Sequence, residues 1–533
     1  MTWPTCVSLK CFPEHLHTSP IMQAMPSNTE VLQAELYADF EAMISFVKES
    51  KTQPADQVER GIFRSLLALG AQLMRLFFAL RAGQYPRTPL EREHGAPLPY
   101  WGQKKRIYFS IFGKIPFWRP YFYAPRQGSE HPLDAQLSLG ADTYSDFLRE
   151  VAEFLSVDMA YKRVSEVLAR LFGFTLSTNA LAQMVAQDAG EVEAYYKQKP
   201  APCPETEAEI LVLQADGKGV PILRQAPAQK KHRLGKGEKR TKKKEAMVTG
   251  LYTIAAHRRA PEEVVRSFFG QHQPGSRPRP QHKYLWATLE GKDTALARLA
   301  EQVQARDGVH IRARVALTDG CEALQDRVVR SFPEFTLILD FVHANEYLWK
   351  AANRLFSEQD PARQKWVEIQ TLAMLSGQSE QVISTLRGRA ETARKTTAAV
   401  LEKSANYFER NLPYMHYDHY LAQGWPIASG VIEGACRHLV KDRFERSGMR
   451  WCRAGAEALL GLRCVAENGD WDGYHQFRRR ARHGRLYRLP YREAAGVEEQ
   501  ALAEPEGARV PSMEVVSRHR IKQQGCGEQR RAA

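Results

Sequence analysis

Three widely separated acidic residues stand where a metal-binding carboxylate would be useful. Asp216 closes the apolar run EILVLQAD, Asp319 closes VHIRARVALTD, and Glu433 lies in ASGVIEGACRHLVKDRF, a segment dense in Arg and His. Hard divalent cations prefer oxygen ligands, and two such cations held about 4 Å apart can clamp both oxygens of an in-line phosphoryl transfer. We therefore expect these three residues to meet at a metal-dependent site.

Each acidic residue also has an ordinary interpretation. Asp-Gly after a strand is a common turn, and a single Glu in a charged helix usually faces solvent. A fourth acid, Asp340 in LILDFVHANEYLW, also ends an apolar run, with His343 three residues later. Asp340 could replace Asp319 as the second ligand. We prefer Asp319, because it ends the fourth predicted strand and precedes a predicted helix. Asp340 and His343 could instead form a supporting pair, in which the carboxylate orients the imidazole.

Cationic residues surround two of these positions and are predicted to contact phosphates. A lysine-rich run spans residues 230–244, and each neutralised phosphate adds salt-dependent affinity. The predicted contacts near the first Asp are Lys218, Lys236, Lys239, Arg240, Lys242, Lys243 and Lys244. Those after Glu433 are Arg437, His438, Lys441, Arg443, Arg446 and Arg450, with Trp451 available to stack on a base. A solvated loop and a solvated helix surface are the alternatives.

The composition is compatible with this chemistry. The chain has 533 residues, 43% of them hydrophobic, so two to four globular domains are expected. Its formal charge of +14 and pI near 9.3 favour polyanionic partners, although ribosomal or membrane-surface binding would give the same charge.

The cysteines indicate neither a disulfide framework nor a zinc ribbon. There are eight, widely scattered and without a CxxC pair. Cys6 and Cys11 stand near His15 and His17, but their spacing fits no regular finger. No signal peptide is recognisable, and charged and polar residues interrupt the apolar segment FRSLLALGAQLMRLFFAL. We expect a core or interface helix there, no membrane partner, and a soluble protein of a reducing compartment.

The amino-terminal part of the chain is predicted to be mostly helical and to bind DNA. Residues 1–100 combine an irregular start with two helices separated at KTQPAD. Residues 101–140 alternate aromatics around Gly113 and predict a small β-hairpin module. Residues 141–200 predict helices joined by GFTLS, with Ser177 or Thr178 as N-cap, in a helix-turn-helix-like outline. An ordinary helical hairpin is the alternative.

The remainder is predicted to be α/β. Residues 205–345 read β-β-β-α-β-α-β, which is the order of a ribonuclease-H-like mixed-sheet catalytic core. If its first and fourth strands are neighbours, Asp216 and Asp319 meet at one sheet edge. A helical insertion at 346–425 precedes the last part of the core at 426–485, which carries Glu433. A tail at 490–533 has the composition of a disordered segment.

The motifs ADGKGVP, ALTDGCEAL, ILDFVHANEYLWKAA and ASGVIEGACRHLVKDRF resemble those of bacterial insertion-sequence transposases of the ISKra type. These belong to the DDE group and are related to Mutator-like transposases. The resemblance covers roughly residues 105–480, and the ASGVIEG segment is its most specific part. It implies that Asp216, Asp319 and Glu433 form a catalytic triad binding two Mg²⁺ or Mn²⁺ ions, and that Asp340 and His343 match an accompanying Cys/Asp-x-x-His element.

One departure from the family concerns the aromatic hairpin. Similar proteins often carry zinc-binding cysteines there, whereas YFYAPRQGSEHPLD has none. We therefore expect no zinc at this position, and the module's role in recognising element ends is in doubt.

The resemblance implies DNA cleavage at element ends followed by strand transfer, on double-stranded element ends and target DNA. An oligomer on DNA is expected, because two ends must be paired, in the bacterial cytoplasm at the nucleoid. Two competing functions remain open. One is a ribonuclease-H-like nuclease that cuts without joining, and the other is a catalytically silent, transposase-derived DNA-binding protein. A helical scaffold that binds protein is a more remote third.

Overall fold

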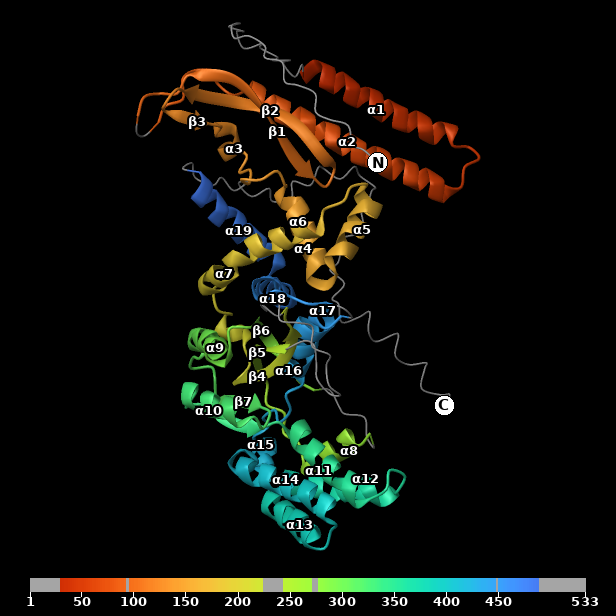
Figure 1. Ribbon diagram of the computed structural model, residues 1–533, viewed down its shortest axis with the longest axis vertical. Coiled ribbons are helices and arrows are strands. Elements are labelled where there is room, and N and C mark those ends of the chain that lie inside the picture. The colour runs from red at the N-terminus through yellow and green to blue at the C-terminus, as the bar shows by residue number, and fades with distance from the viewer. Residues whose placement is uncertain (1–28, 93–94, 224–242, 271–276, 447–448, 488–533) are drawn as a thin grey trace, which may run out of the picture.

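The computed structural model describes residues 29–92, 95–223, 243–270, 277–446 and 449–487, and Figure 1 shows an elongated arrangement of helical and mixed α/β parts. The segments 1–28 and 488–533 therefore lie outside the described residues. So do Cys6, Cys11, His15 and His17, and most of the lysine-rich run.

The chain begins with the predicted pair of helices, α1 (Thr29–Glu49) and α2 (Ala55–Gly83). α1 buries none of its residues, and α2 buries only Phe78, Ala79 and Ala82, near its end. Both helices therefore leave apolar side chains in contact with solvent. By length and composition alone, α2 is apolar enough to cross a membrane, a test that some soluble helices also pass.

The predicted aromatic hairpin forms next. β1 (Tyr100–Ser110) and β2 (Gly113–Ala124) pair antiparallel, and β3 (Gly128–Glu130) extends the sheet. Phe78 of α2 stacks on Phe117 at 4.1 Å between ring centroids, which fixes the helix against the sheet. The short helix α3 (Pro132–Gln136) follows, and its Asp134 binds Arg106 and Arg119.

Four helices join this module to the main sheet. They are α4 (Asp146–Asp158), α5 (Tyr161–Phe172), α6 (Thr178–Asp188) and α7 (Val192–Gln198). α5 ends at Gly173 in the left-handed conformation, and the Ser177 hydroxyl accepts a hydrogen bond from the Ala180 amide at 3.0 Å. Ser177 is thus the N-cap, one of the two residues that the sequence offered for that role.

A five-stranded mixed sheet follows. Its strands are β4 (Ile210–Pro221), β5 (Lys243–Ile254), β6 (Gln281–Thr288), β7 (Ala313–Thr318) and β8 (Thr336–Leu339). The spatial order is β6-β5-β4-β7-β8. β5 is antiparallel to both its neighbours, whereas β4, β7 and β8 run parallel. The first and fourth predicted strands are therefore neighbours, as the predicted site requires.

Helices cover both faces of this sheet. The connecting helices are α8 (Pro261–Phe268), α9 (Lys292–Arg306) and α10 (Glu322–Ser331). A helical region follows, with α11 (Phe341–Leu355), α12 (Pro361–Leu375), α13 (Ser379–Glu391), α14 (Lys395–Asn411) and α15 (Tyr417–Gln423). Residues of α9 and α10 share a core with Leu211, Leu213 and Ala316, whereas α11 shares one with Val212 and Leu317. Side chains alternate along a strand, so these cores lie on opposite faces of the sheet.

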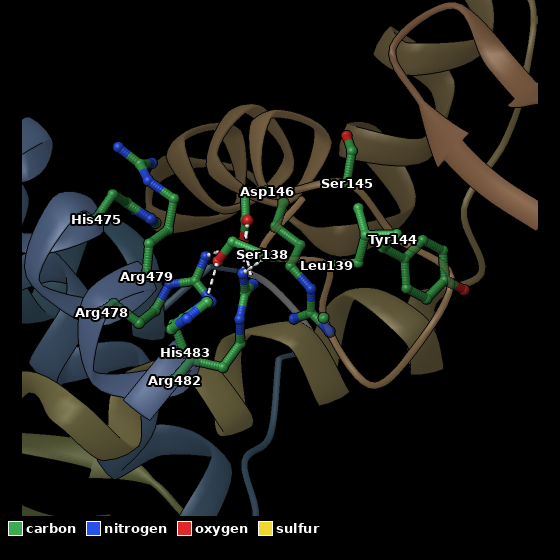
Figure 2. A network of polar contacts seen from close by, with 12 residues as sticks. Ser138, Leu139, Tyr144, Ser145, Asp146, His475, Arg478, Arg479, Arg482 and His483 are labelled. Carbon is green, nitrogen blue, oxygen red and sulfur yellow. Dashed lines mark hydrogen bonds and ion pairs between the residues drawn. The ribbon is translucent and has the colours of Figure 1, made fainter. Parts of the chain in front are cut away.

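The chain then returns to the sheet and finally to the amino-terminal helices. It forms α16 (Gly430–Ala435), a π-helical turn over Cys436–Lys441, α17 (Asp442–Phe444), α18 (Arg453–Glu467) and α19 (Trp471–Leu486). Figure 2 shows arginines of α19 reaching the start of α4: Arg478 and Arg482 both donate to the Asp146 carboxylate. Arg479 donates to Glu150 at 3.1 Å. Ion pairs therefore connect α19, the last described helix, to α4.

Candidate metal centre

Three acidic residues occupy one row of the main sheet. The parallel ladder between β4 and β7 ends with Ala215 opposite Thr318, and that between β7 and β8 ends with Thr318 opposite Leu339. Asp216, Asp319 and Asp340 are the next residues on the three strands. The Asp340 amide still donates to the Thr318 carbonyl at 2.9 Å, so the alignment continues to this row.

The three carboxylates belong to the same face of the sheet. Two residues earlier, Gln214 lies opposite Leu317, and Leu317 lies opposite Ile338. Leu317 and Ile338 pack in the core that includes α11. Because side chains repeat every second residue, the acidic row continues this face. The predicted strand end at Asp216 is wrong, however, since β4 runs on to Pro221 while pairing with β5.

Two hydrogen bonds bring Glu433 to this face. The Ile432 amide donates to the Gln214 side-chain oxygen at 2.9 Å, and the Ser429 amide donates to an Asp340 oxygen at 2.6 Å. Both bonds are buried, and together they fix the start of α16 over the sheet. As a result Asp340, His343 and Glu433 can each offer a ligand atom within 4.8 Å of the others.

The Asp340 carboxylate is largely occupied by hydrogen bonds from the protein backbone. Its side chain is fully buried and accepts backbone hydrogen bonds from Val342 at 2.6 Å and His343 at 3.1 Å, as the N-cap of α11, besides the one from Ser429. Burial opposes its ionisation, but the interaction with the His343 side chain, followed by the hydrogen bonds from Ser429 and the His343 amide, lowers the pKa of Asp340 below its usual value. The contact with Asp340 raises the pKa of His343 to about 9, so the imidazole is cationic at neutral pH.

Asp319 and Glu433 are in a different situation, because negative charge gathers around them. Burial and the neighbouring Asp216 charge raise the pKa of Asp319. Burial, followed by the charges of Asp340 and Asp216, raises the pKa of Glu433. The His343 cation opposes both shifts without cancelling them. A divalent cation among these oxygens would relieve this repulsion, and an all-oxygen donor set suits Mg²⁺ or Mn²⁺.

Sequence reasoning missed three residues that shape this site. Gln214 binds the start of α16. The Cys436 thiol contacts an Asp216 oxygen at 3.3 Å, and burial raises the pKa of that thiol, so it remains protonated. Tyr407 of α14 stacks on Tyr347 with ring centroids 3.7 Å apart, and the ring covers the turn after Asp319. No pattern in the sequence marked these residues, because their roles depend on contacts between distant segments.

The π-helical turn changes what the basic segment after Glu433 can do. Its extra residue per turn shifts the following side chains relative to a regular helix. Arg443, which follows this turn, is buried and donates to the Ser156 carbonyl at 3.1 Å, and Trp451 is buried against Phe444 at 4.8 Å. Their predicted roles in phosphate contact and base stacking are therefore wrong.

The other predicted cations of this segment are more accessible. Arg437, Lys441, Arg446 and Arg450 are exposed. His438 is half-buried, with its ring nitrogen 3.3 Å from Asp442. Of the lysine-rich run, Lys236, Lys239, Arg240 and Lys242 lie outside the described residues. Lys218 and Lys244 are half-buried, and Lys243 forms an ion pair with Glu445.

A basic cleft of about 650 Å³ lies beside the acidic row. Its walls include Phe341 and Val342, which directly follow Asp340, and Ile427 and Ala428, which directly precede Ser429. The rest of the lining carries the cations Arg258, Arg259 and Arg277, together with His257, whose pKa is lowered by burial and by the neighbouring arginines. The Arg259 guanidinium donates to the Trp425 carbonyl at 2.6 Å, while Arg258 is exposed. Positive charge therefore extends from the candidate metal ligands along one side.

No protein-family model and no curated protein matches the chain. Among solved structures, it is similar to the Drosophila P element transposase strand transfer complex. The sequence identity is 9% and the TM-score 0.25, over 63% of this chain and 80% of that chain. A likeness at this level is too loose to establish a shared fold or activity.

Proposed function

We propose that this protein is a transposase that cuts and joins DNA by metal-dependent phosphoryl transfer. The single observation that carries the proposal is the row of Asp216, Asp319 and Asp340, with Glu433 fixed beside it by the bonds of Ser429 and Ile432. The motif resemblance to ISKra-type transposases of the DDE group, which includes the same acids, supports the same function. We retain Asp216, Asp319 and Glu433 as the catalytic residues.

The proposed core is ribonuclease-H-like. The strand order β6-β5-β4-β7-β8, with only β5 antiparallel, supports this assignment. So does the position of Asp319 and Asp340, which directly follow β7 and β8, because ligands of open α/β sheets gather at the carboxyl ends of strands. Within the proposal, α11–α15 form an insertion between the second and third catalytic residues, and the segments before residue 205 bind DNA.

Asp216, Asp319 and Glu433 would hold two Mg²⁺ or Mn²⁺ ions, which supply charge stabilisation at the attacking and leaving oxygens when bound. Two further residues of the chain, Asp340 and His343, would position these ligands and adjust the charge around them. Asp340 holds α16 through Ser429, and thereby sets the position of Glu433. His343, cationic through Asp340, offsets part of the negative charge near Asp319 and Glu433. No covalent enzyme intermediate is required, so no nucleophilic side chain is needed.

DNA would approach along the positive surfaces around the row. Arg437, Lys441, Arg446 and Arg450 are accessible for phosphate contacts on one side, and the basic cleft with Arg258 and Arg277 on another. Pairing of two DNA ends would require more than one copy of the chain. We also propose that the protein acts at the bacterial nucleoid.

The test is a strand-transfer assay with Mg²⁺ on donor DNA carrying the ends that flank the coding sequence of this chain. We expect joined products from the wild type and a loss of about 10²–10³-fold or more in Asp216→Asn, Asp319→Asn and Glu433→Gln, because each removes a negative charge that would hold the metal ions at the reacting phosphate. Asp293→Asn is the matched control, since Asp293 starts α9 with an exposed side chain and should change nothing.

Two outcomes would replace the proposal. Cleavage without joining would identify a ribonuclease-H-like nuclease on the same acids. DNA binding without cleavage in either Mg²⁺ or Mn²⁺ would identify a silent DNA-binding descendant. Metal binding can be checked without activity, because Mn²⁺ should raise the melting temperature of the wild type and not that of Asp319→Asn.

A further inference from the structure

One surface of the hairpin module carries a continuous series of aromatic rings that the proposed function does not use. Trp101 meets Tyr123 edge-on at 5.4 Å, Tyr123 is parallel to Tyr121 at 6.0 Å, and Tyr121 lies 5.0 Å from the His131 ring. We call these four residues the aromatic ladder. Tyr121 and Tyr123 share one face of β2 because they are two residues apart.

A β-bulge exposes Trp101, at the end of the aromatic ladder, to solvent. Tyr100 lies opposite Phe122 and Gly102 opposite Tyr121, so Trp101 is an extra residue without a partner on β2. Bulges re-aim side chains in this way. Trp101 is consequently 61% exposed. Cross-strand packing alone explains the two tyrosines, but it does not require a large indole to stand mostly in water.

The charge of this face is positive. The Lys104 ammonium lies over the Tyr121 ring, 5.0 Å from its centroid. The nearest acid on α3, Asp134, is buried and neutralised by Arg106 and Arg119. Burial and nearby cations lower the pKa of His131 to about 4, so its ring stays neutral and able to stack at physiological pH.

We propose that the aromatic ladder binds single-stranded nucleic acid. Aromatic faces accept bases of any sequence, and an adjacent cation attracts the phosphates, which is the combination that single-strand-binding surfaces use. The site takes unpaired bases, with Trp101 and Tyr121 as stacking groups and Lys104 as the phosphate contact. It goes beyond the proposed function, because it needs neither the acidic row nor a metal ion.

The experiment measures binding of a fluorescent 12-nucleotide oligo-dT to the full chain by anisotropy, in EDTA. Trp101→Ala and Tyr121→Ala are each expected to weaken binding about tenfold. Trp118→Ala is the matched control. Trp118 is also exposed and lies under a lysine, Lys105, but three residues before Tyr121, and so on the opposite face of β2. Its affinity should stay within about twofold of the wild type.

Further arms decide the outcome. Trp101→Phe should retain most of the affinity, since it keeps a stacking face. Oligo-rU in place of oligo-dT separates RNA from DNA as the natural source, and binding of either supports the site. The proposal would be overturned if Trp101→Ala and Trp118→Ala weakened oligo-dT binding equally. It would also be overturned if Trp101→Ala reduced the affinity for duplex DNA as much as the affinity for oligo-dT. A proline-rich peptide that binds the ladder while oligonucleotides do not would overturn it as well. Unchanged circular dichroism of each variant establishes that folding is intact.

Discussion

Arg437 and Arg443 are close in sequence but have different surroundings. The Arg437 side chain is 67% exposed, whereas Arg443 is buried, with its guanidinium 4.8 Å from the Trp451 ring centroid. Removing a buried arginine side chain destabilises the fold, because its hydrogen-bond partners lose their contacts and a cavity is left. Removing an exposed arginine side chain has little effect on stability. The two positions therefore separate DNA contact from folding.

We predict that Arg443→Ala lowers the free energy of unfolding by about 2–4 kcal/mol, because it removes the hydrogen bond to Ser156 and the packing on Trp451. Arg437→Ala should change it by less than about 0.5 kcal/mol, and should instead weaken DNA binding and reduce the slope of affinity against salt by about one. Urea unfolding and a salt titration of DNA binding measure these effects. Equal destabilisation by both variants would contradict the assignment.

Glu153 and His475 form a fully buried pair between α4 and α19, 3.8 Å apart. Arg149 and Arg478 lie nearby but bind Asp188. Burial, together with the Asp188 charge, raises the pKa of Glu153 well above 4.5. Burial lowers the pKa of His475 from 6.5 to about 3. In the folded protein the proton therefore resides on the glutamate, and in the unfolded chain on the histidine.

This exchange predicts a plateau in the pair's contribution to stability. Below about pH 6.5 the unfolded histidine binds a proton that the folded histidine does not, which lowers stability. Above pH 4.5 the folded glutamate holds a proton that the unfolded glutamate does not, and this offsets the loss until the pH rises through the raised pKa of Glu153. Below 4.5 the unfolded state holds two protons, so stability falls on the acid side. In Glu153→Gln the acid-side fall should begin at 6.5, with a slope of about 1.4 kcal/mol per pH unit.

Urea unfolding at several pH values between 4.5 and 8 measures this change. Glu166→Gln, at an exposed ion pair with Arg163, is the control and should keep the wild-type profile. A Glu153→Gln profile parallel to that of the wild type would show that the glutamate is ionised in the folded state.

At the scale of elements, strands were easier to predict than the contacts between them. The apolar runs before Asp216, Asp319 and Asp340 are long enough to indicate strands, but whether the first and fourth strands are neighbours stayed a condition that the structure meets. The register that aligns the three acids depends on pairing between segments that are 103 residues apart for β4 and β7 (318 − 215) and 21 apart for β7 and β8 (339 − 318), and so left no local signal. A helical pattern reveals neither the π-helical turn nor the contacts that bury Arg443 and Trp451, and so these two residues were misassigned.

The turn after Asp319 is supported by the distant helix α14. A Cβ added to Gly320 would overlap the Tyr407 ring, and that ring is confined by its stacking on Tyr347. Arg410 of the same helix also donates to the Gly320 carbonyl. The helical region between Asp340 and Glu433 is thereby connected to the position of a candidate ligand.

We predict that Gly320→Ala lowers stability by about 1–3 kcal/mol and reduces strand transfer, because the turn must move away from the ring. Adding Tyr407→Ala should recover part of both losses, since the overlap disappears. The measurement is a double-variant cycle in unfolding free energy and activity. Gly388→Ala, in a helix with open space around it, is the control. Strictly additive losses would exclude this coupling.

At the scale of the whole molecule, α19 connects the end of the described chain to its early helices. Arg482 donates to the Asp146 carboxylate, at 2.9 Å for one oxygen, and to the Ser138 carbonyl at 2.6 Å (Figure 2). His483 and Ser138 are in contact at 3.1 Å. The net positive charge of the chain predicted polyanionic partners, but composition does not show that arginines of α19 are paired internally.

We predict that Arg482→Gln lowers the free energy of unfolding by about 2–4 kcal/mol, since it leaves a largely buried carboxylate with fewer partners. The double variant with Asp146→Asn should lose less than the two single variants together. Hydrogen exchange should show α4 and α19 opening together. Arg485→Gln, at an exposed pair with Glu191, should cost less than about 0.5 kcal/mol. If Arg482→Gln also cost less than about 0.5 kcal/mol, the ion pair between Arg482 and Asp146 would not contribute to stability.

The order in which the ligands occur along the chain has a consequence for synthesis on the ribosome. Glu433 follows Asp216 by 217 residues (433 − 216). At translation rates of about 5–20 residues per second, roughly 10–40 s pass between the emergence of the two. The aromatic ladder and the early helices are outside the ribosome throughout that interval, before the acids can meet. A nascent chain would therefore be able to hold nucleic acid before it is able to cut it.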